Sequence, residues 1–364
     1  MKRSLYIAFI AATTFSIAAC TKQIIAPTPQ VPDASRSYIF FEPEVVTSDN
    51  TKATILTGET LPTAVGTAFG VIGYHGTISL FGAPTPSNKG IAQVARSVDG
   101  VFEYSPLAAW QGADNHDFYA FYPYNLNAYV SHNVNNTTNL ANPYITYSQP
   151  TANDATMVDL LTAKTSVTKA AGDEVAIKFY HRLWALDVKI KNSMTKGIAA
   201  DGKTEVNNPS VTITKIELYV KDFPQTAVIP LDPNVTNNPI TYGTETMTPS
   251  TPYEIPVPSA DKTIAYNQTK SYGTLFFIPL TSSQKFIYRL VISYTDSMGS
   301  GSFTYPKTGY KESSGTFEGG KKYTLTLDKT NDTFVIGTYF DPDDERTDFQ
   351  PGDWSDANVN HEFN

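Results

Sequence analysis

The chain contains one cysteine, and the residues around it indicate which chemistry its thiol serves. Cys20 follows Ile17, Ala18 and Ala19, which is the order of a lipobox: a medium apolar residue, two small residues, then cysteine. In this pattern a signal peptide is cut before the cysteine, and the sulfur receives a diacylglycerol. The preceding residues fit, because a short basic start leads into an apolar run too short to span a bilayer. The sequence therefore predicts lipidation of Cys20.

The other residues that could do chemistry form no recognisable catalytic or metal-binding motif. The chain has no HExxH, G-x-S-x-G, P-loop or GxGxxG sequence. The acidic run Asp341–Asp348 lacks EF-hand spacing and is expected to be a solvated loop. Each tryptophan could stack on a sugar, but large aromatic rings are mostly buried on average. We therefore expect structural roles, no metal site and no cofactor for these residues: His75, His116, His132, His181, His361, Trp110, Trp184 and Trp354.

Charge and composition restrict the partners and the compartment. The net charge of −8 at pH 7 gives no overall attraction to phosphates, so no nucleic-acid partner is expected. We assign residues 1–19 to a lipoprotein signal peptide and residues 20–36, which contain three prolines, to a lipidated tether. One cysteine cannot form a disulfide within the chain, so the exported protein must be stable through packing alone.

A period of two in the apolar residues predicts an all-β fold. Apolar and charged residues alternate along 186–191, so the first set should be buried and the second solvated. The inward set is Leu186, Val188 and Ile190, and the outward set is Asp187, Lys189 and Lys191. The alternation recurs at 215–222, 285–294 and 321–329. Many short strands separated by turn residues favour a β-sandwich.

The beginning of the folded part offers a strand with an unusual residue. Ser37–Val46 is the first strand candidate, and Pro43 within it lacks an amide proton. Such a strand is expected at a sheet edge or with a bulge. The fullest helical pattern, Asp154–Lys164, is short.

A stretch with little apolar pattern and several glycine and asparagine residues separates two blocks of strands at residues 192–210. We place a domain boundary there. The prediction is an N-terminal β-sandwich domain at residues 37–195 and a C-terminal β-sandwich domain at residues 205–364.

Three stretches carry a resemblance to a known family. WQGADNHDFYAFYPY at 110–124 is similar to a signature in which tryptophan precedes FYAYYP. MVDLLTAKT at 157–165, followed by VAIKFYHRLWALDVKIKN at 175–192, is similar to a block containing DLL-A and F-H-LA-L-V. GTFEGGKKYTLTL at 315–327 is similar to a later F-aG-Y-l-l strand. Together with the lipobox, these stretches resemble the fimbrillin-like proteins, the bacterial fimbrial lipoproteins that form type V pili.

This resemblance implies two tandem transthyretin-like β-sandwich domains and a non-enzymatic role as a cell-surface fimbrial subunit or adhesin. Such subunits are exported as lipoproteins, lose an N-terminal segment to a protease and polymerise. Removal of the first strand opens an apolar groove, which a terminal strand of another subunit fills by edge addition. The implied partners are other pilin subunits and, through the lipid anchor, the outer membrane. The ligand of an adhesin stays open.

The positions of basic residues bear on this processing. In the stalk subunits of the family, an arginine follows the first strand, and the protease cuts there. Here Arg36 precedes the first strand, and Lys52 follows it. A cut at Arg36 would release the lipid and leave Ser37–Val46 in place. Both residues are candidate processing sites, and a stalk, tip or anchor position stays open.

Two other functions agree with the sequence. A surface glycan-binding lipoprotein would hold several exposed aromatic rings on one concave face. A secreted hydrolase would bring two or more carboxylates with shifted pKa values together in a cleft.

Overall fold

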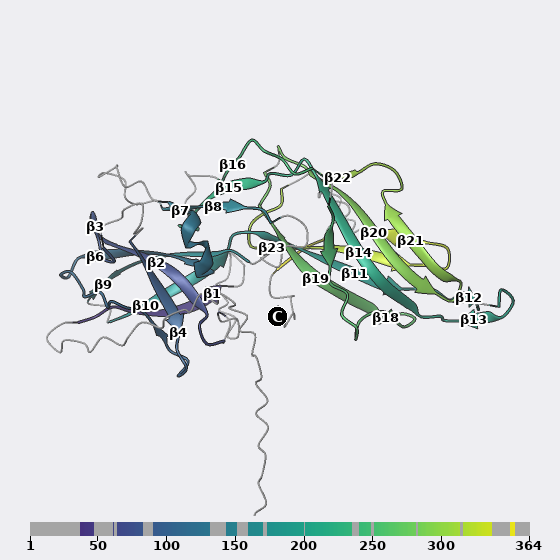
Figure 1. Cartoon of the computed structure of the whole chain (residues 1–364), viewed down its shortest axis with the longest axis horizontal. Coiled ribbons are helices and arrows are strands. Elements are labelled where there is room, and N and C mark those ends of the chain that lie inside the picture. Colours follow the sequence, from purple (N-terminus) through teal and green to yellow (C-terminus); the bar gives the residue numbers. More distant parts are fainter. Residues whose placement is uncertain are drawn as a thin grey trace, which may run out of the picture.

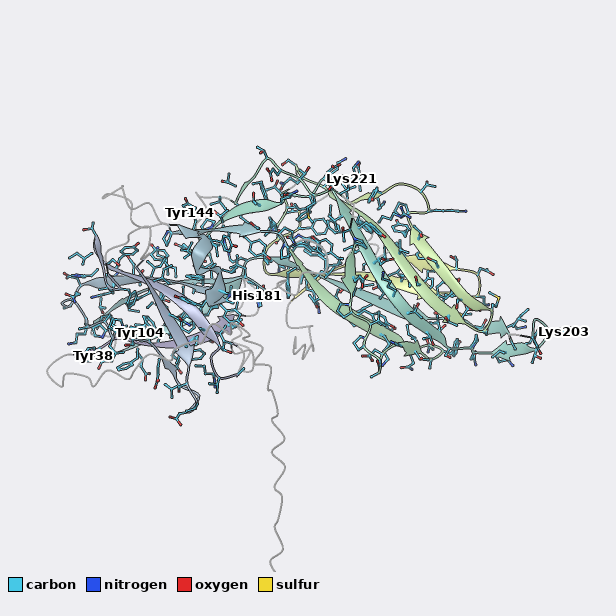
Figure 2. The ribbon with its side chains drawn as sticks, in the orientation of Figure 1. Tyr38, Tyr104, Tyr144, His181, Lys203 and Lys221 are labelled. Carbon is cyan, nitrogen blue, oxygen red and sulfur yellow. The ribbon has the colours of Figure 1, made fainter. Side chains whose placement is uncertain are left out.

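The described part of the chain consists of β-strands joined by turns (Figures 1 and 2). The computed structural model describes residues 37–46, 61, 64–82, 90–131, 143–150, 159–169, 173–199, 201–234, 240–248, 251–281, 283–313, 316–336 and 350–353. The regular elements among them are strands and one 3-10 helix, η1 (Tyr124–Tyr129), so the predicted all-β fold is confirmed. No helix within these ranges has the length and apolarity needed to cross a membrane.

An 8-stranded sheet occupies one end of the molecule (Figure 1). Its strands lie in the order β1, β10, β9, β6, β2, β4 and β5, and β3 pairs with β2. Their bounds are β1 (Phe40–Val46), β2 (Ala68–His75), β3 (Ile78–Ser79), β4 (Ile91–Arg96), β5 (Phe102–Glu103), β6 (Asn115–Tyr122), β9 (Leu161–Thr168) and β10 (Glu174–His181). β1 stands at one end of this order and runs parallel to β10. The edge position that Pro43 predicted for the first strand is therefore confirmed.

Two further sheets pack face to face at the other end. The 5-stranded sheet has the order β19, β11, β23 and β24, with β25 on β23, and the 6-stranded sheet has the order β17, β14, β20 and β21, with β18 on β14 and β22 on β20. Their bounds are β11 (Trp184–Asn192), β14 (Val211–Lys221), β17 (Tyr253–Ile255), β18 (Thr263–Ile264), β19 (Thr269–Phe277), β20 (Phe286–Asp296), β21 (Gly299–Tyr305), β22 (Lys311–Ser313), β23 (Lys321–Lys329), β24 (Phe334–Ile336) and β25 (Gln350–Asp353). The Trp184 ring of the first sheet meets the Phe286 ring of the second edge-on, with centroids 5.0 Å apart.

A 4-stranded sheet joins early and late parts of the chain. Its order is β16 (Thr241–Tyr242), β15 (Thr226–Pro230), β8 (Tyr144–Ser148) and β7 (Val130–Ser131). Just after β8, the buried Gln149 amide donates to Phe276 O at 2.9 Å and accepts from the Ile278 N–H at 3.0 Å. These hydrogen bonds connect the 4-stranded sheet to the end of β19. A small hairpin of β12 (Lys196–Ile198) and β13 (Glu205–Asn207) extends the far end (Figure 1).

The large sheet is buried on both faces at β2. Phe69 and Val71 belong to one apolar cluster, and Ile72 and Tyr74 belong to the other. A strand covered on both faces reads as a continuous apolar run, which explains the sequence AFGVIGYH. Gly70 belongs to this packing, because a Cβ there would lie 2.2 Å from the Phe121 ring.

The alternation along β11 predicted one face correctly and missed one residue of the other. Leu186, Val188 and Ile190 are buried, as expected, and both lysines are partly exposed. The prediction was wrong for Asp187, which is 3% exposed. Its carboxylate accepts a hydrogen bond from Ser271 Oγ of the neighbouring β19 at 2.5 Å. A partner on the next strand allows a charged residue to be buried at a position that alternation assigns to solvent.

The change from one sheet to the other occurs earlier than the polar stretch 192–210. β11 lies inside the predicted N-terminal range, yet both of its neighbours, β19 and β23, come from later in the chain. The switch therefore falls at Arg182 and Leu183, between β10 and β11. Part of the helical candidate Asp154–Lys164 was wrong, because Leu161–Lys164 begin β9. Buried strand segments and short helices can share the same apolar pattern.

Candidate functional site

β1 and the residues just before it are held by backbone bonds to two different segments. The Ile39 N–H donates to Ala108 O at 3.0 Å, and the Trp110 N–H donates to Ser37 O at 3.1 Å. From Phe40 onward the strand pairs in parallel with β10. No further strand pairs with β1 in the described ranges. Backbone bonds of this kind do not depend on the side chains of the strand, so a different sequence could make them.

The side chains of this segment alternate between core and surface. Ile39, Phe41 and Val45 are buried, whereas Phe40 is 43% exposed. The three inward side chains join a cluster supplied mostly by β2, β4, β6, β9 and β10. Full burial of one such side chain contributes about 1.5–3 kcal/mol relative to exposure. The first strand thus closes an apolar core that the rest of the sheet builds.

Phe41 is the central anchor of this contact. Its ring centroid lies 5.4 Å from those of Tyr104 and Phe118 and 6.2 Å from that of Phe81. Edge-to-face and tilted pairs at these distances add to the energy of area burial. Phe41 thus covers these three rings.

Tyr104 ties the start of the segment to the core. Its hydroxyl donates to Ile39 O at 2.8 Å and accepts from the Ala108 N–H at 3.2 Å. Burial raises the pKa of Tyr104 to about 12, while the Ala108 amide acts in the opposite direction. The hydroxyl therefore stays protonated at neutral pH and can donate to a backbone carbonyl.

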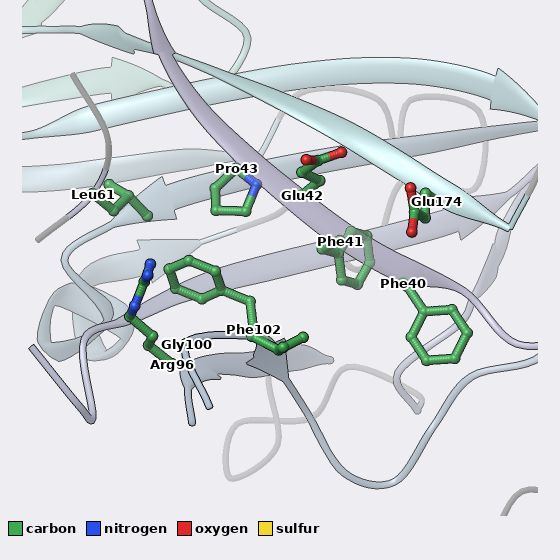
Figure 3. Close-up of a pocket in the computed structure, with 10 residues that line it drawn as sticks. Phe40, Phe41, Glu42, Pro43, Leu61, Arg96, Gly100, Phe102 and Glu174 are labelled. Atoms are coloured by element: carbon green, nitrogen blue, oxygen red, sulfur yellow. The ribbon is translucent and has the colours of Figure 1, made fainter. Parts of the chain in front are cut away.

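A cavity of about 370 Å³ lies along β1 (Figure 3). Its lining residues are Phe40, Phe41, Glu42, Pro43, Leu61, Arg96, Gly100, Val101, Phe102 and Glu174. The Arg96 guanidinium lies 5.4 Å from the centroid of the Phe102 ring. The cavity is bounded by β1 itself, so its shape depends on the presence of that strand.

The histidines lie in local hydrogen-bond networks. The Gln111 N–H donates to His116 Nε2 at 3.2 Å, so the proton of the neutral ring is on Nδ1, which donates to Asp114 O at 2.8 Å. Burial lowers the pKa of His116, and the Asp114 carbonyl opposes this effect. His75 stacks on His116 with centroids 4.7 Å apart.

His181 Nδ1 contacts the Asp159 carboxylate. Sequence reasoning missed this pair, because Asp159 precedes β9 and His181 ends β10, so the pairing of two strands brings them together.

Both described tryptophans pack in cores. Trp110 meets the His116 ring edge-on at 4.9 Å, and Trp184 stacks on Phe277 at 4.9 Å. The Trp184 Nε1–H donates to Ile278 O at 2.9 Å. The packing roles expected for these two residues are confirmed. Leu183, beside Trp184, is buried as well.

Several predicted residues lie outside the described ranges. They are the lipobox Ile17, Ala18 and Ala19, the lipidation site Cys20, the candidate processing sites Arg36 and Lys52, the acidic run Asp341–Asp348, and His132, Trp354 and His361. Within the described ranges, no group of three or more histidine, cysteine or acidic side chains is placed to hold a metal ion.

Sequence reasoning found β1 and its edge position but not its surroundings. The parallel pairing with β10, the Tyr104 hydroxyl and the bonds to residues 108–110 involve segments far apart in the chain. The sequence offered one signal, since Pro43 marks an edge. No local pattern identifies the partner strand.

Comparison with known proteins supplies a family and a fold. The family described as fimbrillin-like matches residues 51–339. A Bacteroides uniformis protein described as a cell-adhesion candidate aligns with a TM-score of 0.52 and 15% identity, covering 89% of this chain and 100% of its own. A fimbrial protein of Bacteroides vulgatus gives a TM-score of 0.49 and 18% identity, covering 82% of this chain and 98% of its own. The sequence matches no curated protein. The likeness to the Bacteroides uniformis structure concerns the fold alone.

Proposed function

Because the chain belongs to the fimbrillin-like family, we propose that it is a cell-surface fimbrial subunit that assembles with other pilin subunits by strand addition at the β1 edge. One observation carries the proposal: a single edge strand, held by backbone bonds, fills an apolar groove that the rest of the large sheet forms. The role is structural and non-enzymatic, and it needs no cofactor.

Strand addition requires that an incoming strand make the bonds of the outgoing one. The amides and carbonyls of β10 and of residues 108–110, together with the Tyr104 hydroxyl, bond to backbone atoms. An incoming strand would run parallel to β10 and place apolar side chains where Ile39, Phe41 and Val45 now lie. Backbone bonds then supply affinity, and the groove supplies specificity at alternate positions.

Export and processing belong to the same proposal. Residues 1–19 act as the signal peptide, Cys20 carries the lipid, and residues 20–36 tether the folded body to the outer membrane. A cut after Lys52 would separate β1 from the body, whereas a cut after Arg36 would release only the tether. The choice between these cuts separates a polymerising subunit from one that keeps its first strand.

We also propose that the chain folds as two tandem transthyretin-like β-sandwich domains. The pairing of β11 with β19 and β23 favours a boundary at Arg182 and Leu183 in place of residues 195–205. Limited proteolysis followed by mass analysis would locate the boundary.

A glycan-binding lipoprotein is the second candidate. It would need several exposed aromatic rings gathered on one face. Trp110 and Trp184 are buried, and the most exposed aromatic residues of the described chain, Phe40, Tyr129 and Tyr266, lie on three separate elements or loops. This distribution favours the fimbrial subunit.

The test is deletion of residues 21–46 from the mature chain. The shortened protein should stay folded, take up a strand from another subunit and form oligomers that resist mild detergent. A matched control deletes only residues 21–36, which keeps β1 in place, and should form no detergent-resistant oligomers. Size-exclusion chromatography and gel analysis report the outcome. A folded protein that forms no detergent-resistant oligomers at high concentration after the longer deletion would refute strand addition.

A further inference from the structure

The 6-stranded sheet ends in a second long edge, β21. This strand pairs with β20 along its whole length, from Leu290–Tyr305 to Asp296–Gly299, and no other described strand pairs with it. Figure 1 shows β21 at the outer side of that sheet. One row of its backbone amides and carbonyls is therefore directed away from the sheet.

The turn before β21 identifies that row. Asp296 pairs with Gly299 across the two residues Ser297 and Met298, and a two-residue hairpin closes on a hydrogen-bonded pair. The bonds to β20 then recur at every second residue, so the backbone amides and carbonyls of Gly301 and Phe303 also bond to β20. The outward row consists of Ser300, Ser302 and Thr304.

Two other edge strands, β1 and β19, carry features that discourage pairing on their open sides. β1 contains Pro43 between Glu42 and Glu44. The ladder of β19 with β11 shifts register at Asp187 and Val188, and β19 has Gly273 at φ +39°, where a Cβ would lie 3.0 Å from Pro256. β21 has the sequence GSGSFTY, which contains no charged residue and no proline. Native proteins commonly protect edge strands with prolines, charged residues and irregular pairing. An edge strand without these features, such as β21, therefore indicates an interaction surface.

We propose that β21 pairs antiparallel with β21 of a second copy of this chain, about a twofold axis at Ser302. In that register Ser302 lies opposite its own counterpart, and Ser300 lies opposite Thr304. The edge is thus self-complementary, as an isologous interface requires. Pairs of serine and threonine across neighbouring strands form hydrogen bonds, and no like charges meet.

The core-facing side chains of β21 are also compatible with pairing to a second copy. Phe303 and Tyr305 are partly buried and pack against the core, and the Phe303 ring lies 5.2 Å from that of Phe334. The small residues at 299–302 leave room for a neighbouring backbone. Pairing would continue the 6-stranded sheet from one copy into the next. This contact goes beyond strand addition at β1, because it uses another sheet at the other end of the molecule, and either can fail alone.

A single introduced thiol tests the axis. Ser302→Cys, made in the full chain with Cys20→Ala so that no other thiol is present, should give a disulfide-linked dimer under mild oxidation. Directly opposed residues of antiparallel strands have Cα atoms about 4.5–5.5 Å apart, within the range of a disulfide. Ser210→Cys, another exposed serine, is the matched control and should give much less dimer. Equal yields from both variants would overturn the proposal.

A backbone substitution provides the second measurement. Ser302→Pro removes an outward amide and keeps the bonds to β20, so it should weaken the dimer of the full chain by about tenfold or more. Ser302→Ala keeps the amide and should dimerise like the unmodified chain. Sedimentation or light scattering over a concentration series measures this difference. A monomeric unmodified chain, or a proline variant that dimerises equally well, would refute the pairing, and neither result bears on strand addition at β1.

Discussion

β1 and β11 have the same alternating pattern but different surroundings. Each sends apolar side chains into a core, and each has a parallel neighbour, β10 or β23. β11 is bonded on both sides, by β19 and β23, whereas β1 is bonded on one side by β10. Removal of β11 would break two ladders in the middle of a sheet. Removal of β1 would break one ladder and the short contact with residues 108–110.

The comparison shows that burial of a strand's side chains does not decide whether another strand can replace it. A strand can contribute strongly to a core and still be exchangeable when it lies at an edge, because another chain can approach from the open side. A central strand cannot be exchanged without opening its sheet. Substitutions in β11 should therefore unfold the protein, and substitutions in β1 should loosen one edge.

Val188→Asp should have the largest effect. Val188 is buried in the middle of β11, and an unpaired carboxylate there costs several kcal/mol unless it becomes neutral. We expect a greatly lowered melting temperature or an unfolded protein. Lys189→Asp, at a partly exposed neighbouring position, is the control and should change the melt little. Equal melts for both variants would show that the assignment of the two faces is wrong.

Phe41→Ala should have the next largest effect, confined to one edge. The change removes the ring that contacts Tyr104, Phe118 and Phe81 and should cost about 3 kcal/mol. Hydrogen exchange should show lost protection in β10 and preserved protection in β11, since only β1 detaches. Phe40→Ala, at a surface position, is the control. Equal loss of protection in β11 would mean that β1 and the central strands unfold as one unit.

The sequence predicted what depends on neighbours along the chain and missed what depends on neighbours in space. Alternation found β11 and the inward direction of Leu186, Val188 and Ile190, and Pro43 marked β1 as an edge strand. Asp187 was missed because its partner, Ser271, lies on a strand far along the chain. The place of β11 in the later sheet was missed for the same reason, since pairing partners leave no local signal.

Ser271→Ala tests whether the partner on the neighbouring strand stabilises Asp187 in β11. The substitution removes the hydroxyl that donates to the buried Asp187 carboxylate and should cost about 2 kcal/mol. Ser271→Thr keeps a hydroxyl and should retain most of the stability. Urea unfolding of both variants measures the difference. Equal midpoints for the alanine variant and the unmodified protein would show that this bond contributes nothing measurable.

Tyr104→Phe should have the smallest effect and is specific to the β1 side. The phenyl ring keeps its packing, but Ile39 O and the Ala108 N–H lose their shared partner, at a cost of about 1–2 kcal/mol. Burial raises the pKa of this hydroxyl from its ordinary 10.0 to about 12. The unfolded chain therefore releases the proton first as pH rises, so the stabilisation is complete below pH 10 and is lost between pH 10 and about 12. The unmodified protein should thus lose the stability contributed by the Tyr104 hydroxyl over that pH range. Tyr104→Phe has no such hydroxyl and should not show this loss. Unfolding free energies at pH 8 and about pH 11, from urea titrations of both proteins, measure the difference. If the gap between them does not narrow as the pH rises, the Tyr104 hydroxyl does not hold the β1 segment in the way the structure indicates.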